Sequence, residues 1–179
     1  RAVLRVLFTS DFFKEARFQR VKSPAELVAS TLRLVGGHDL PSPFDQEFAL
    51  QPSYMGQDLL NPPSVEGWHT GKEWINSGSL LKRINFVADL VGDTTLPGVQ
   101  AIIERMRSTG TISPEELVDR CLEEMGPMEV KDETREQLVG QIQEEGPITW
   151  NTDEDTAAST KRVARMLQLI GGTIEYQFA

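Results

Sequence analysis

The sequence predicts an all-α fold, an irregular multi-helix domain with a long ordered loop rich in proline and glycine. Apolar residues recur at helical spacing along most of the chain, and no segment shows the apolar/polar alternation that is typical of a strand. Two segments, Ser23-Pro24-Ala25-Glu26 and Ser113-Pro114-Glu115-Glu116, also carry a strong helix-start pattern. Each has a serine cap, a proline at the first helical position and a glutamate placed to reach back.

Apolar spacing, capping residues and helix-stopping glycines together place the helices along the chain. The predicted segments are residues 1–8, a short turn over 9–13, then 23–35, 44–51, 80–91, 99–106, 113–125 and 138–142, and a last helix that begins at Asp153 or Asp155 and runs to Ile170. Gly36-Gly37, Gly92 and Gly146-Pro147 are expected to end three of these helices.

Residues 38–79 interrupt the helical pattern, because they hold five of the ten prolines and glycines at positions 56, 67, 71 and 78. Apart from the short helix, we expect a long ordered loop, and such loops in compact domains are often functional. Residues 1–91 would form a helical core with this loop. Residues 92–179 would form an acidic helical part, packed with the first part as one domain.

Composition restricts the class of partner. Acidic side chains outnumber basic ones by 27 to 18, and residues 92–179 alone carry seventeen acidic and eight basic side chains. An acidic protein repels phosphate backbones, so we expect no nucleic-acid partner. The apolar stretches are too short to span a membrane. Residues 1–35 differ, with seven basic and three acidic side chains, and we interpret them as a surface that meets acidic parts of the same protein.

The only cysteine, Cys121, excludes an internal disulfide. It lies on the apolar face of a predicted helix, so we expect a buried, unreactive thiol.

Two tryptophans stand six residues apart in the proline- and glycine-rich loop. In one interpretation they are pins: residues 52–79 are clamped over the helices at 23–35 and 79–91, and the indole N–H groups bond loop carbonyls. In the other they form an exposed platform for a ligand such as a sugar, a base or proline. We favour pins, because ordering so long a loop needs buried apolar groups to offset the lost entropy. The candidate ligand-binding residues are Trp68, Trp74, His69, Glu66, Asn76 and Arg83.

Two of these candidates also have structural interpretations. Asn76 is expected to cap the following helix, and Arg83 could pair with a loop carboxylate such as Glu66.

Standard catalytic and metal-binding motifs are absent from the sequence. It has no phosphate-binding glycine loop, no nucleophile elbow and no cysteine or histidine spacing typical of metal ligands. A two-histidine metal site would need His38 and His69 together with a carboxylate such as Asp39 or Glu66, and solvated loop histidines are the simpler expectation. We therefore predict no catalytic residue, no metal and no cofactor in this chain.

Several stretches resemble a known family. They are Leu7-Phe8-Thr9-Ser10-Asp11-Phe12-Phe13, Val21-Lys22-Ser23-Pro24-Ala25-Glu26-Leu27-Val28, Met55-Gly56-Gln57-Asp58-Leu59-Leu60-Asn61-Pro62-Pro63 running into Val65-Glu66-Gly67-Trp68, Trp74-Ile75-Asn76-Ser77, Leu81-Lys82-Arg83-Ile84-Asn85-Phe86 and Thr173-Ile174-Glu175-Tyr176-Gln177-Phe178. Together they resemble the large bacterial family called "domain of unknown function eighteen-hundred". The resemblance covers residues 1–91 and the C-terminal end, and residues 92–150 more weakly. One departure is Asp58-Leu59-Leu60, where many members carry Pro-Leu-Phe.

The resemblance implies a bacterial source and a longer protein of which this chain is the C-terminal part. It carries over no catalytic residue, since none is established for the family. A frequent gene neighbour exported by the twin-arginine route hints at the cell envelope, so both the cytoplasm and the envelope stay open as compartments.

Two functions from different classes follow. The first is a non-catalytic helical module that binds a protein partner or its own N-terminal region, with self-association through exposed Phe8, Phe12, Phe13 and Phe18. The second is part of an enzyme, such as a hydrolase of envelope polymers, whose catalytic groups lie upstream. The first is favoured, because the chain lacks a nucleophile, a base and a metal set.

Overall fold

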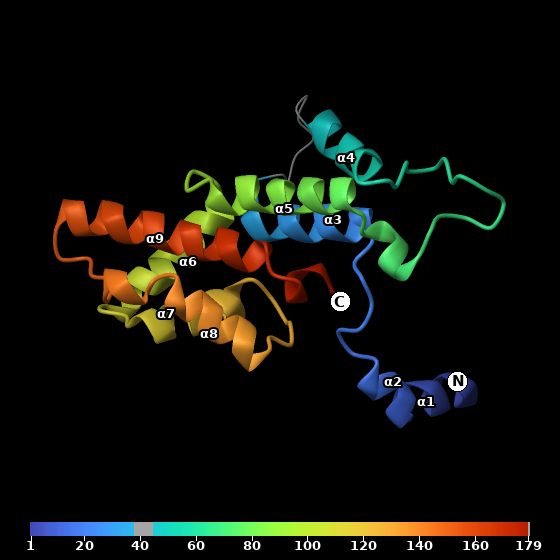
Figure 1. The fold of residues 1–179 in the computed structure, drawn as a ribbon, viewed down its shortest axis with the longest axis horizontal. Coiled ribbons are helices and arrows are strands. Elements are labelled where there is room, and N and C mark those ends of the chain that lie inside the picture. Colours follow the sequence, from blue (N-terminus) through green and yellow to red (C-terminus); the bar gives the residue numbers. More distant parts are fainter. Residues whose placement is uncertain (38–44, 179) are drawn as a thin grey trace.

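The computed structural model describes residues 1–37 and 45–178, and its regular structure in these residues is helical (Figure 1). The α-helices are α1 (Ala2–Thr9), α2 (Asp11–Glu15), α3 (Pro24–Val35), α4 (Asp45–Tyr54), α5 (Ser77–Gly92), α6 (Pro97–Thr109), α7 (Pro114–Glu124), α8 (Asp132–Gly140) and α9 (Asp153–Gly171). The short 3-10 turns are η1 (Gly71–Trp74), η2 (Gln143–Glu145) and η3 (Glu175–Gln177). The described residues contain isolated bridges but no strand, so the predicted all-α class is confirmed.

The core lies around α5 and α9, which pack side by side, with α3 against α5 and α7 against α9 (Figure 1). Two glycines allow neighbouring helices to pack closely, one between α5 and α9 and one between α3 and α6. A Cβ on Gly171 of α9 would lie 2.5 Å from Cγ1 of Val87 on α5. A Cβ on Gly98 of α6 would lie 2.1 Å from the carbonyl oxygen of Leu34 on α3. The backbones of α6 and α3 therefore nearly touch at Gly98, whereas at Gly171 the side chain of Val87 lies against the backbone of α9.

The capping residues predicted from the sequence act as caps. Ser23 accepts a hydrogen bond from the N–H of Glu26, whose carboxylate accepts one from the N–H of Ser23. Ser113 accepts one from the N–H of Glu116 in the same way at the start of α7. Each bond satisfies an N–H group that the first helical turn leaves without a partner.

Helix α4 is longer than predicted, since it includes Pro52 and ends at Tyr54 rather than near residue 51. Pro52 lies in its last turn and is buried, and the ring of Phe48 stands edge-on to Phe86 of α5, with 6.5 Å between centroids. Packing on the body thus extends the helix past a residue that usually ends one. The predicted metal candidates His38 and Asp39 lie outside the described residues.

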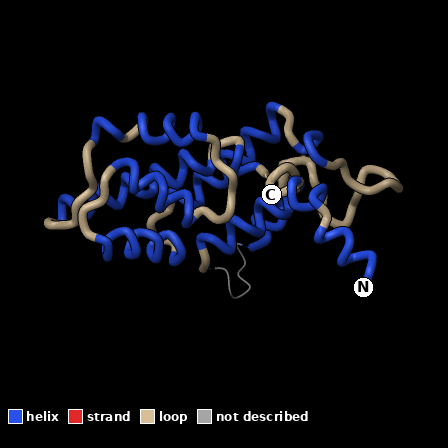
Figure 2. Tube along the Cα trace, turned by 90° about the horizontal axis from the view of Figure 1, so that it is seen from below, coloured by secondary structure: helices blue, strands red, loops and turns tan. Residues whose placement is uncertain are grey.

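The first two helices extend away from this core. Helices α1 and α2 contact each other, bury none of their residues and project from one end of the body (Figure 1). The loop between α4 and α5 projects near the same end, as the perpendicular view in Figure 2 also shows. In the part of the chain that the structure describes, no helix is both long and apolar enough to cross a bilayer.

Candidate functional site

The tryptophan loop, residues 55–76, leaves α4 and returns to α5. Both of its ends are anchored, because Met55 and Trp74 are buried and the Gln57 Oε1 accepts a hydrogen bond from the N–H of Ala25 at 2.8 Å. Its middle, residues 58–66, is exposed throughout and projects from the body. The prediction that residues 52–79 are clamped over the helices is therefore wrong for this middle part, where Leu60 and Val65 are almost fully exposed.

Asp58 fixes the shape of the projecting part. Its carboxylate accepts hydrogen bonds from Asn61 Nδ2 at 2.8 Å and Ser53 Oγ at 3.0 Å, and its carbonyl accepts one from Trp68 Nε1 at 3.0 Å. The bond from Asn61, followed by that from Ser53, lowers the pKa of Asp58 below its ordinary value. Trp68 is half-buried, and its bond to Asp58 joins the two sides of the loop.

Trp74, by contrast, ties the loop to the body. It is 6% exposed, and its carbonyl accepts a hydrogen bond from Ser79 Oγ at 2.8 Å. Two residues later, the Asn76 Oδ1 accepts from the N–H groups of Gly78 and Ser79, as a cap of α5. The predicted cap is therefore present, and Asn76 is engaged in structure.

His69 and Glu66 lie on the exposed side of the loop. The His69 Nδ1 is 3.4 Å from Oε2 of Glu73, and its ring centroid is 6.5 Å from that of Trp74. Glu66 stands in the turn that the bridge between Ser64 and Gly67 closes. Across residues 1–37 and 45–178, no group of three or more His, Cys, Asp or Glu side chains could hold a metal ion.

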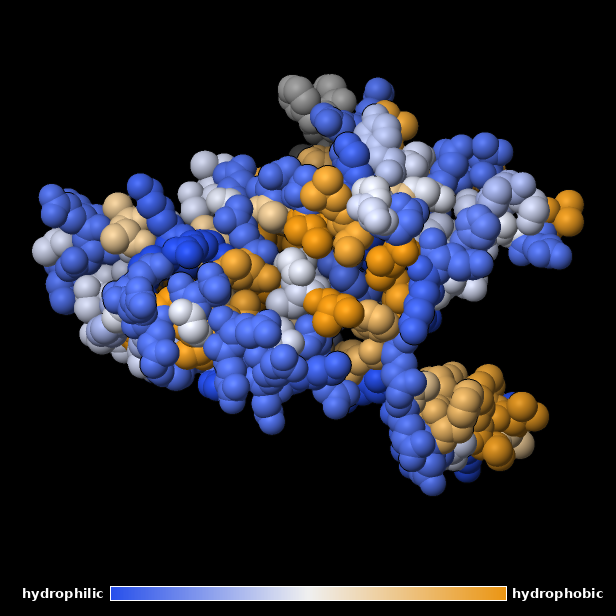
Figure 3. All heavy atoms as spheres, in the orientation of Figure 1, coloured by the Kyte–Doolittle hydropathy of each residue, from blue (hydrophilic) through white to orange (hydrophobic). Residues whose placement is uncertain are grey.

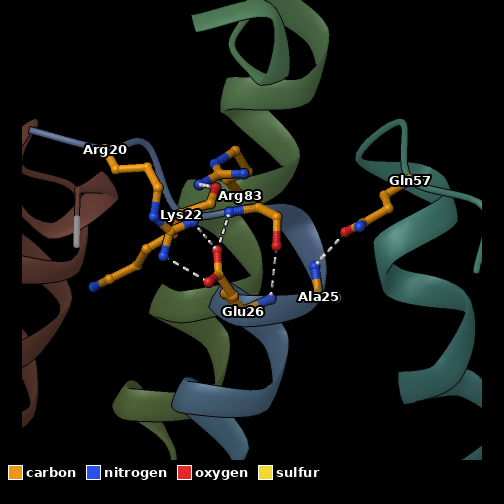
Figure 4. A network of polar contacts seen from close by, with 7 residues as sticks. Arg20, Lys22, Ala25, Glu26, Gln57 and Arg83 are labelled. Carbon is orange, nitrogen blue, oxygen red and sulfur yellow. Dashed lines mark hydrogen bonds and ion pairs between the residues drawn. The ribbon is translucent and has the colours of Figure 1, made fainter. Parts of the chain in front are cut away.

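Arg83 lies away from the loop, in a buried polar cluster between α5, the start of α3 and the C-terminal segment. It has no exposed surface. Its Nε donates to Oε1 of Gln177 at 2.8 Å. Its Nη2 donates to the carbonyl of Lys22 at 2.8 Å (Figure 4). The predicted pairing with Glu66 is wrong, because Arg83 points to the face of α5 that residues 22 and 177 cover, whereas Glu66 stands on the exposed turn.

Lys22 joins the same cluster. Its Nζ donates to the carbonyl of Tyr176 at 2.9 Å and stands 4.3 Å from the centroid of that ring, while its backbone N–H donates to the carbonyl of Gln177 at 2.9 Å. Burial, and then the nearby positive charge of Arg83, lower the pKa of Lys22. Burial lowers the pKa of Arg83 to about 10. The two cations are thus held in a poorly hydrated place.

Glu26 supplies the negative charge beside these cations. Both of its oxygens accept hydrogen bonds from the guanidinium of Arg20, at 2.6 and 2.7 Å (Figure 4). Chiefly because of Arg20, the pKa of Glu26 falls to about 2. Its charge favours the charged forms of Lys22 and Arg83. The cluster fastens three segments of the chain to one another, and we assign it a structural role.

The six predicted site residues therefore do not form one site. His69 and Trp74 lie together, and Trp68 bonds the carbonyl of Asp58 within the loop. Glu66 stands on the exposed turn, Asn76 caps α5, and Arg83 belongs to the buried cluster. Sequence reasoning missed Lys22 and Gln177. Both fall in stretches that carry the family resemblance, and this was the signal that could have indicated them.

Cys121 is fully buried on α7, and burial, with the nearby charge of Glu124 adding to it, raises the pKa of its thiol to about 12. It is therefore a core residue, as predicted, since a thiol that stays protonated is a poor nucleophile.

Comparison with known proteins gives one match. A family model with the description "Protein of unknown function (DUF1800)" matches residues 1–178, and so includes residues 92–150, where the resemblance in the sequence is weaker. No curated protein and no solved structure matches the chain. The role of the chain therefore has to be argued from its own surfaces.

Proposed function

We propose that this chain, which belongs to the family described as "Protein of unknown function (DUF1800)", is a non-catalytic interaction module that docks a polypeptide partner through its first two helices. We call these helices the arm (α1 and α2, residues 2–15). The observation that carries the proposal is that the arm exposes a dense apolar surface (Figure 3). Its exposed large apolar side chains are Val3, Leu4, Val6, Leu7, Phe8, Phe12 and Phe13.

The exposure is extensive. Val3 is 80% exposed and Phe12 78% exposed, and the contact between Phe8 and Phe13, 4.9 Å between ring centroids, holds α1 against α2. Phe18, also predicted to be exposed, is partly buried. Helices of eight and five residues are unstable alone in water, and burying each large apolar side chain contributes about 1.5–3 kcal/mol. A partner that covers the arm would therefore stabilise it strongly.

The charge of the arm indicates the chemistry of that partner. Arg1 and Arg5 flank the apolar residues of α1, and Lys14 lies 3.5 Å from Asp11 in α2. An apolar surface with an acidic rim complements this arrangement. The resemblance makes an upstream region of a longer bacterial protein the first choice of partner, and a separate protein the second. In this proposal the chain is the C-terminal module of that protein.

We also propose that residues 1–91 and 92–179 act as one domain apart from the arm. The support is that α5, from the first part, has its most extensive contact with α9, from the second. A single cooperative unfolding transition, seen alike by tryptophan fluorescence and by circular dichroism, is expected. Two separate transitions would contradict it.

Sedimentation velocity over a range of concentrations tests the interaction. We expect the wild-type chain to self-associate, or to bind its upstream region when that is supplied as a separate polypeptide. The double variant Phe8→Ser/Phe12→Ser should abolish this association and leave the unfolding of the body unchanged. A matched control is Leu81→Ser, which removes an apolar side chain that is 60% exposed on α5. A strictly monomeric wild type that does not bind the upstream region would contradict the proposal.

A further inference from the structure

A large open cleft separates the base of the arm from the body. Its volume is about 1300 Å³, and its lining residues come from three segments, within 14–19, 127–132 and 174–178. Phe18, Met128 and Phe178 give these walls apolar surface. Because Lys14 and Glu15 of α2 also line it, a partner that covers the arm lies at the mouth of the cleft.

Glu175 is a buried carboxylate in the wall of this cleft. It is 8% exposed, and its Oε1 accepts a hydrogen bond from Thr134 Oγ1 of α8 at 2.7 Å. Its Oε2 is buried and has no hydrogen-bond partner. The same residue also borders a second hollow of about 670 Å³, between α8 and α9. A buried carboxylate oxygen without a donor is costly, so this position calls for a cationic or N–H group that the described residues do not provide.

The cations around the cleft are engaged elsewhere or remain in solvent. Lys14 lies 3.5 Å from Asp11, and the guanidinium of Arg17 stacks 4.5 Å from the ring centroid of Phe18. Lys131 is exposed at the start of α8. Within the described part of the chain, none of them forms an ion pair with Glu175. A cation that pairs with Oε2 has to come from outside the described residues, and because this oxygen is buried, the Glu175 side chain has to turn toward the cleft to meet it.

We infer that the cleft receives an arginine side chain of the polypeptide partner that covers the arm, with its guanidinium bonded to Glu175 Oε2. This rests on the proposed function and adds to it the residue that the partner must present. Arginine fits because its planar guanidinium donates several hydrogen bonds in fixed directions, while its stem packs on apolar walls. A charge-assisted bond is also stronger than a neutral one. A single free carboxylate oxygen, by contrast, gives a metal ion too few ligands.

A titration with a small probe tests the inference on the full chain. The probe is N-acetyl-L-arginine amide, followed by the amide chemical shifts of the ¹⁵N-labelled protein. We expect saturable shifts at Phe18, Thr134 and Glu175. The citrulline analogue, which has the same shape but no charge, should bind roughly tenfold more weakly or worse. Absence of saturable shifts at these residues, or equal binding of the citrulline analogue, would overturn the inference.

Two variants locate the site. Glu175→Gln, which keeps an acceptor for Thr134, should weaken arginine binding by roughly tenfold or more. Glu129→Gln removes the same charge from an exposed position in the cleft wall and should leave the affinity nearly unchanged. An equal loss in both variants would show that the probe senses only net charge, and would overturn the inference. The arm variants test the proposed function separately, so association through the arm without arginine binding removes only this inference.

Discussion

Arg83 and Gln177 are 94 residues apart in the sequence and are joined by a buried hydrogen bond of 2.8 Å from Nε to Oε1. Gln177 also donates from Nε2 to the carbonyl of Gly171 at 3.3 Å. The amide is thus held in one orientation, with its oxygen toward the guanidinium. Since no carboxylate among the described residues bonds Arg83 directly, the C-terminal segment depends on a bond between a charged group and a neutral one.

The first prediction concerns this bond. Gln177→Leu leaves the Arg83 Nε buried without an acceptor, so the free energy of unfolding should fall by about 2–4 kcal/mol. The double variant Arg83→Met/Gln177→Leu should cost less than the two single variants together, by about 1–3 kcal/mol. Urea denaturation measures all three, with Lys82→Met on the exposed side of α5 as a control expected to change stability by less than about 0.5 kcal/mol. Additive losses would contradict the direct coupling.

The second prediction separates the two tryptophans. Trp74→Ala should lower the free energy of unfolding by about 3–5 kcal/mol, because the indole is buried against the body. Trp68→Ala should lower it by about 1 kcal/mol, because that indole is half-buried and bonds the carbonyl of Asp58 within the loop. Chemical denaturation of both variants measures the difference. If each lost less than about 1 kcal/mol, the tryptophans would be surface groups and the ligand platform would be the better interpretation.

The third prediction concerns the pH dependence of Cys121. Its pKa is about 12 in the folded protein and 9.0 ordinarily, so above pH 9 the unfolded chain releases this proton first. The unfolded state then binds fewer protons, and stability falls as pH rises. Between pH 8 and pH 10 the wild type should lose about 1 kcal/mol more than Cys121→Ala, which has no thiol to titrate. The urea midpoints at the two pH values measure it, and identical pH slopes would show that the thiol is already accessible.

The fourth prediction compares two helical glycines. A methyl group on Gly98 would overlap the backbone of Leu34 and Val35, so Gly98→Ala should destabilise the protein by about 2 kcal/mol or more as α6 moves away from α3. Gly140, at the end of α8, has nothing within 4 Å of the position that a methyl group would take, so Gly140→Ala should stabilise the protein by about 0.4–1 kcal/mol. Thermal melting of the two variants should therefore shift in opposite directions, and a shared direction would contradict the close approach of α3 and α6.

Local signals explain what the sequence could predict. The starts of α3, α5 and α7 follow from Ser23, Asn76 and Ser113, because a cap acts within three residues of itself. The end of α4 does not follow from a local signal, because the helix continues past Pro52 to Tyr54 while it packs on α5 through Phe48 and Phe86. Local sequence signals thus predict the first residue of a helix better than its last residue, because tertiary contacts can decide where the helix ends.

Long-range partners explain what the sequence could not predict. From the sequence, Glu66 in the loop was the expected acidic partner of Arg83. The observed acceptors are instead the carbonyl of Lys22 and the side chain of Gln177, which are distant in sequence and carry no negative charge. Arginine is also rarely buried without a carboxylate, so no pattern in the sequence marks it as a core residue. The exposed arm was predictable, because Phe8, Phe12 and Phe13 are too many large apolar groups for two short helices to bury.

The order of synthesis gives the buried cluster a further consequence. Arg83 leaves the ribosome long before Gln177, so α5 can pack on α3 while the guanidinium still lacks its side-chain acceptor. The segment that joins the arm to α3 is also unfastened at that stage. The N–H of Lys22 bonds the carbonyl of Gln177, and Val21 forms its bridge with Phe178. A nascent chain therefore carries a loosely held arm until residues 177 and 178 have emerged from the ribosome, and the docking surface is positioned only then.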